Sequence, residues 1–110
     1  MSADLQQIVA QSGDAADMHA TVPTLLLELQ TLLGALTASA NASTQRGRRP
    51  FRPGPDWSTR LGELAYGVYL LADQSGVDVA ESVLATAGRL QQHGQSQQAA
   101  TGQGWPFEAQ

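Results

Sequence analysis

The chain has 110 residues, no cysteine and a net charge of −4. This length suits one domain, the lack of cysteine excludes disulfides and thiolate metal sites, and the acidic balance argues against a nucleic-acid binder. The N-terminus lacks the features of a signal peptide, and we find no run of about 18 apolar residues that would cross a membrane. We therefore expect a soluble, cytoplasmic protein without a membrane partner.

The first half of the sequence predicts two helices of different character. Residues 3–12 suit a short helix with a narrow apolar stripe, stopped by Gly13. A second helix starts near Thr21 and holds seven leucines within residues 25–36. A helix that is apolar nearly all round is normally buried on more than one side, so this one predicts a homodimer interface.

A linker rich in proline, glycine and arginine separates this helix from the next. Residues 41–56 show no periodicity, and four of the six arginines of the chain fall there, at Arg46, Arg48, Arg49 and Arg52. Guanidinium groups suit phosphates, so any anion contact would start at this cluster. A contact with an acidic partner and a merely solvated loop are the alternatives.

Two further helices follow the linker. The third is capped by Asp56 or Ser58 and ended by Gly76, and the fourth follows Asp78 and stops before Gly94. An apolar stripe on the third helix predicts the face that packs into the core, namely Leu61, Leu64, Ala65, Val68, Leu71 and Ala72.

These elements predict an all-α bundle of about four helices in residues 1–94. Residues 95–110 are rich in glutamine and glycine and too polar to offset the entropy of ordering, so we expect a disordered tail. Its apolar residues, 105–107, form a possible docking peptide.

Residues 63–78 read Glu-Leu-Ala-Tyr-Gly-Val-Tyr-Leu-Leu-Ala-Asp-Gln-Ser-Gly-Val-Asp. They resemble the second half of the MazG-like nucleotide pyrophosphohydrolase family, whose members read E-L-x-D, an apolar stretch and L-A-D-x-x-G-I-D. Residues 28–36 can be laid over the first family motif, E-E-x-x-E followed by L-x-x-A-L. The resemblance implies a MazG-like helical bundle and Mg²⁺-dependent hydrolysis of nucleoside triphosphates to monophosphate and pyrophosphate.

The resemblance also implies site residues. Mg²⁺ prefers carboxylate oxygens, and acids three residues apart share one helix face. The first acidic pair of the family becomes Glu28 and Thr31 here, and the second becomes Glu63 and Tyr66, so half of the acids are replaced. We expect Glu28 and Glu63 as metal ligands that hold one Mg²⁺ through waters, and Arg89 as the phosphate-binding residue. No catalytic residue is assigned.

Structural roles compete with these assignments. Glu28 is the only charged residue between Asp17 and Arg46, and we expect it to be buried among leucines. A salt bridge to Arg60 or Arg89, or a solvent-facing position, would explain it equally. Glu63 lies opposite the predicted core stripe, where a solvated position is the alternative.

Three functions follow from these observations. The first is a MazG-like homodimer that is degenerate as an enzyme and binds a nucleotide or a protein partner. The second is an active Mg²⁺-dependent pyrophosphohydrolase, which the replaced acids disfavour. The third is a helical adaptor without affinity for nucleotides.

Overall fold

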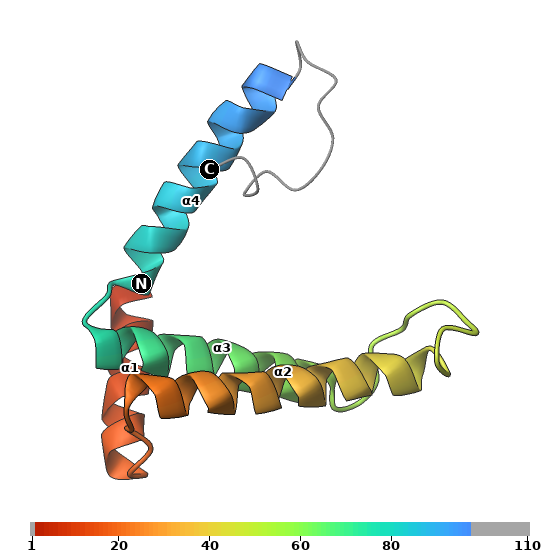
Figure 1. The fold of residues 1–110 in the computed structure, drawn as a ribbon, viewed down its shortest axis with the longest axis horizontal. Coiled ribbons are helices and arrows are strands. Elements are labelled where there is room, and N and C mark those ends of the chain that lie inside the picture. The colour runs from red at the N-terminus through yellow and green to blue at the C-terminus, as the bar shows by residue number, and fades with distance from the viewer. Residues whose placement is uncertain (1, 98–110) are drawn as a thin grey trace. The chain divides into compact units, whose positions relative to one another are not determined.

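A computed structural model describes residues 2–97 of the chain, and it describes side chains for residues 5–94. It contains four helices, α1 Ser2–Ala15, α2 Val22–Ser43, α3 Trp57–Ser75 and α4 Val79–Gln97 (Figure 1). No strand occurs in residues 2–97. The predicted all-α class with four helices is therefore confirmed. Most of the predicted tail, including residues 105–107, lies outside the described residues.

The chain divides into two units, Met1–Asp78 and Val79–Gln110. The first unit contains α1, α2 and α3. The second contains the single helix α4, which starts directly after Asp78 and continues beyond Gly94, the predicted stop. Glycine lowers helix propensity by only about 1 kcal/mol, which the rest of a long helix can offset.

The start of α2 is the one that the sequence predicts. Thr21 is the N-cap, and its Oγ1 accepts a hydrogen bond of 3.4 Å from the backbone N of Thr24, while Pro23 lies in the first turn. The helix ends later than predicted, at Ser43, because the alanines and serines after Leu36 remain compatible with a helix. The connection to α3 is therefore residues 44–56.

The ends of α3 also match their predicted residues. Asp56 is the N-cap, but its side chain makes no capping bond. It instead accepts a hydrogen bond of 2.8 Å from Ser39 Oγ, which joins the end of α2 to the start of α3. Gly76 ends α3 in the left-handed conformation, with φ of 72°, which glycine adopts without steric cost.

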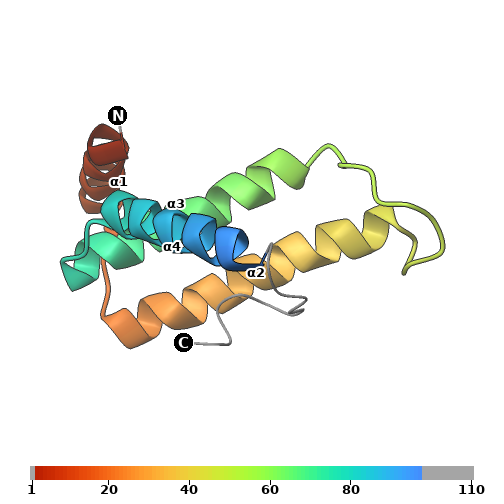
Figure 2. The same ribbon diagram turned by 90° about the horizontal axis from the view of Figure 1, so that it is seen from above.

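Helices α2 and α3 run antiparallel and pack along their length (Figures 1 and 2). The Ser39–Asp56 bond joins one end, Gly67 contacts Leu29 and Leu32 in the middle, and Leu25 and Leu70 share the core at the other end. Helix α1 crosses α3 near that second end and contributes Val9 to the same core (Figure 1). The core therefore lies where three helices meet, away from the linker.

The predicted core face of α3 is correct only near the C-terminal end of the helix, where Ala72 is 6% exposed and Leu71 packs against the core. Leu61 and Val68 from that stripe are 47% and 39% exposed, whereas Leu70, from the opposite face, is 3% exposed. Both faces of α3 are apolar, so periodicity alone did not decide which one turns toward α2. Gly67 decides it, because the missing side chain lets α2 approach there.

Gly67 is predicted to be the position of α3 least tolerant of a large side chain. A Cβ there would lie 2.8 Å from Leu29 Cδ2 and 3.1 Å from Leu32 Cδ1. We expect Gly67→Leu to lower the free energy of unfolding by about 1–3 kcal/mol through overpacking. The matched control is Gly62→Leu, because a Cβ at that glycine of the same helix meets nothing within 4 Å. Urea unfolding followed by circular dichroism measures both, and equal midpoints would contradict the assigned packing.

Gly13 lies inside α1 and does not end it, contrary to the prediction. The residue is buried, and a Cβ there would lie 2.8 Å from Leu70 Cδ1 and 3.0 Å from His19 Cε1. This glycine is therefore used for close approach of α1 to α3. A glycine that ends a helix and a glycine that lets two helices approach closely cannot be distinguished from the sequence alone.

The leucines of α2 are buried on one side only. Leu25 is 3% exposed, but Leu26, Leu27 and Leu33 are 46%, 64% and 52% exposed. Among the described helices, α2 alone is long and apolar enough to cross a membrane by length and composition. The expectation that no segment could cross a membrane was too strong, because the density of leucines in α2 compensates for the polar residues between them. Mostly buried core helices meet the same criterion, but only 6% of the apolar window of α2 is buried.

Candidate functional site

The two predicted metal ligands occupy different levels of the α2–α3 pair. Glu28 is exposed, not buried among leucines as predicted. Glu63 is half-buried, and its Oε1 accepts a hydrogen bond of 3.0 Å from Arg60 Nη1. The contacts along the helix pair place Glu63 level with residues near Leu33. Glu28 is then about 7 Å away along the axis, at 1.5 Å per residue.

The residues at the replaced acidic positions have other partners. Thr31 Oγ1 donates to the carbonyl of Leu27, one turn earlier, at 3.4 Å. The hydroxyl of Tyr66 lies 2.7 Å from Ser12 Oγ and so holds α1 against α3. A structural contact between two helices therefore stands where the family pattern has an aspartate.

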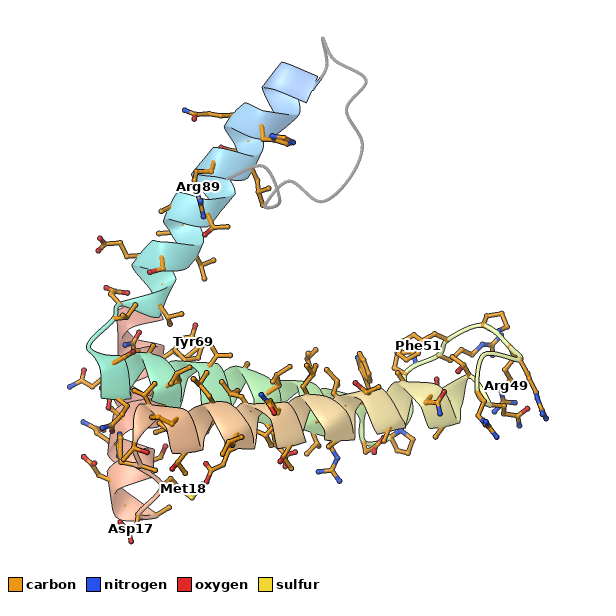
Figure 3. The ribbon with its side chains drawn as sticks, viewed as in Figure 1. Asp17, Met18, Arg49, Phe51, Tyr69 and Arg89 are labelled. Carbon is orange, nitrogen blue, oxygen red and sulfur yellow. The ribbon has the colours of Figure 1, made fainter. Side chains whose placement is uncertain are left out.

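Arg89 lies on α4, in the second unit, where its side chain is exposed. Its Nη2 donates to Thr86 Oγ1, one turn earlier, at 3.2 Å. Figure 3 labels Arg89 near the middle of that helix. The predicted phosphate ligand is therefore available to solvent.

No group of three or more histidine, cysteine, aspartate or glutamate side chains converges as a metal site in the part of the chain that the structure describes. His19 shows the nearest convergence of such residues. Its Nε2 lies 2.9 Å from Asp73 Oδ2, and its Nδ1 lies 3.0 Å from Asp14 Oδ1 but outside hydrogen-bond geometry. These contacts tie the α1–α2 connection to the end of α3, which is a structural role.

A cleft of the first unit lies between the end of α2 and the linker. Its volume is about 930 Å³, within the range of small-molecule sites. One wall is the small-residue face of α2, and the other is the linker with the start of α3. The lining residues are Ala35, Ala38, Ser39, Ala42, Ser43, Arg49, Pro50, Arg52, Gly54, Pro55, Asp56 and Arg60.

Hydrogen bonds hold the linker in place around this cleft. Gln45, Arg46 and Gly47 have positive φ and reverse the chain after α2. The backbone N of Arg48 and that of Arg49 both donate to the carbonyl of Thr44, at 2.8 and 3.1 Å. Residues 44–49 of the aperiodic linker therefore form a hydrogen-bonded turn, and Figure 3 shows the loop projecting at the end of α2 with Arg49 and Phe51 on it.

The three arginines of the cleft differ in their partners. Arg60 lies between two acids, with Glu63 at 3.0 Å and Asp56 at 3.9 Å. Arg49 Nε donates to the carbonyl of Ser43 at 3.2 Å. For Arg52, no hydrogen bond or ion pair occurs among the described residues. Positive charge without a matching acid therefore lies on the linker side.

Sequence reasoning found the arginines but missed the wall that faces them. The alanines and serines of α2 repeat at spacings of three and four, at positions 35, 38, 39, 42 and 43. This pattern places small side chains on one helix face. The sequence pattern assigns the last of these residues, Ala42 and Ser43, to the linker, whereas the structure places them on α2, where small side chains leave room for a cleft.

No protein-family model, curated protein or solved structure matches this chain. The resemblance to the MazG-like family consequently depends on the motif residues alone.

Proposed function

We propose that this chain is a MazG-like helical protein that forms a homodimer and acts by binding a nucleotide or a protein partner, without hydrolysing the nucleotide. The observation that carries the proposal is an exposed apolar face on the α2–α3 pair. We call it the leucine face and define it as Leu26, Leu33, Leu61 and Val68. These four side chains are 39–52% exposed.

Helix geometry places the leucine face on one side of the helix pair. At 100° per residue, Leu26 and Leu33 lie about 90° from the line of α2 that contacts α3, and Leu61 and Val68 lie about 130° from the corresponding line of α3. Because the helices are antiparallel, both displacements point to the same side. Tyr66 lies on the other side, where α1 packs.

A second copy of the chain is the partner that this face suits. It contains four apolar residues from two helices and no charged one, which is the composition of a homodimer core. Full burial of a half-exposed leucine contributes about 1 kcal/mol, and a twofold interface counts each residue twice. The core of the monomer is small. Among the described residues, its buried apolar members are Val9, Leu25, Leu70 and Ala72. The free energy gained by burying the leucine face in a dimer is therefore significant beside the stability of the monomer.

The residues that stand at the acidic positions of the family pattern support binding of a nucleotide in preference to its hydrolysis. Tyr66 and Thr31 supply no negative charge, and Glu63 is paired with Arg60. Several Mg²⁺ ions need several carboxylates, so we propose at most one weakly held ion, on Glu28 and Glu63.

The test is to incubate the wild-type chain with Mg²⁺ and a panel of nucleoside triphosphates and to measure released pyrophosphate, alongside calorimetric titration of a non-hydrolysable triphosphate. We expect no turnover, with or without a nucleotide complex. Turnover that Glu28→Gln abolishes would contradict the proposal and assign an active pyrophosphohydrolase. Retained turnover in that variant would indicate a contaminating enzyme, which repurification removes.

A further inference from the structure

The cleft between α2 and the linker combines three features that point to an anionic ligand. The first is charge: Arg49, Arg52 and Arg60 line it, and Asp56 is the single acid among the lining residues. The excess is two positive charges. An open site of this kind attracts a multiply charged anion more strongly than a single carboxylate.

The second feature is the orientation of the linker arginines. The bond from Arg49 Nε to the carbonyl of Ser43 fixes that guanidinium at the end of α2 and leaves its two terminal nitrogens without a partner in the described part of the chain. Arg52 lies three residues further along the same loop and lines the same cleft. A guanidinium offers parallel donors that match two oxygens of one phosphate group.

The third feature is an unsatisfied polar atom in the wall. Ser43 Oγ is buried and has no hydrogen-bond partner among the residues that the structure describes. Buried hydroxyl groups are normally paired, because an unpaired one loses its bonds to water without replacement. Ser43 also supplies the carbonyl that positions Arg49, so the unpaired hydroxyl and the fixed guanidinium lie on the same residue of the cleft.

We infer that this cleft binds the phosphate groups of a nucleoside di- or triphosphate, with Arg49 and Arg52 as the phosphate ligands. Arg60 is held by Asp56 and Glu63 and contributes its field without a free donor pair. No aromatic residue lines the cleft, so the phosphates, and not stacking on the base, supply the recognition. The inference rests on the proposed function, because it locates the nucleotide there and moves the phosphate contact from Arg89 to the linker.

The experiment is isothermal titration of a non-hydrolysable nucleoside triphosphate, and separately of pyrophosphate, into the full chain. The test variant is Arg49→Gln/Arg52→Gln. The control is Arg46→Gln/Arg48→Gln. It also removes two positive charges from this loop, but at positions that do not line the cleft. Circular dichroism checks that both variants keep the helical content of the wild type.

We expect the test variant to bind both ligands at least about tenfold more weakly, because it loses the charged hydrogen bonds to the phosphates, and we expect the affinity of the control to change by less than about threefold. If both variants lose affinity equally, general electrostatics explain binding and the cleft is overturned. If the test variant binds the nucleotide with the same affinity as the wild type, the assignment of the cleft is overturned but the proposed nucleotide binding stands. If the wild type binds neither ligand, nucleotide binding and the cleft fail together. Loss of binding only in Arg89→Gln would return the phosphate contact to α4.

Discussion

Leu33→Glu is expected to convert the proposed homodimer into a monomer. Leu33 is 52% exposed and lies on the leucine face, next to Leu26 and on the same side as Leu61. A glutamate there would bring an unpaired carboxylate into an apolar interface, which costs several kcal/mol unless the charge is neutralised. The twofold axis introduces the change twice, so we expect the dimer dissociation constant to rise at least about a hundredfold.

The matched control is Leu27→Glu. Leu27 is more exposed, at 64%, but helix geometry places it on the side of α2 that points away from α3. Leu27→Glu makes the same change of charge and volume as Leu33→Glu, in the same helix. Light scattering after gel filtration at micromolar concentration measures both variants. Dissociation by both substitutions would contradict the leucine face as the interface, and dissociation by Leu27→Glu alone would move the interface to the outer side of α2.

Leu70→Ala is expected to cause the largest loss of stability in the first unit. Leu70 is 3% exposed, shares the core with Val9 of α1 and Leu25 of α2, and has one Cδ against Gly13. Truncation of a buried leucine costs about 2–5 kcal/mol through lost burial and the cavity left behind. Domains have only about 5–15 kcal/mol in total, so we expect partial or complete loss of cooperative unfolding.

Urea unfolding monitored by circular dichroism measures this effect. Leu27→Ala is the control, because it removes the same atoms from an exposed position and should change the free energy of unfolding by less than about 0.5 kcal/mol. A similar small effect for Leu70→Ala would show that α1, α2 and α3 do not share the core described here.

Three helix boundaries match the residues that the sequence predicts, namely the start of α2 and both ends of α3. Thr21 with Pro23 and Gly76 act through local chemistry, since each residue affects only the turn in which it lies. Most of the predicted face of α3 was wrong for the opposite reason. Its choice depends on Gly67 and on partners from α1 and α2 that are distant in the sequence.

The candidate site was predictable only in its charges. The arginine cluster can be seen directly in the sequence. The cleft, however, depends on the way Gln45, Arg46 and Gly47 reverse the chain, and no periodic pattern in the sequence predicts this reversal. Glu28 shows the reverse problem. Its leucine neighbours suggested burial, whereas the helix turns them to other sides and leaves the carboxylate exposed.

The most direct test of the central claim is the mass of the wild-type chain in solution, measured by light scattering at micromolar concentration. We predict twice the chain mass of 11.6 kDa, in agreement with a dimer closed through the leucine face. A mass of one chain across the micromolar range would contradict the homodimer and favour a helical adaptor whose apolar face binds another protein.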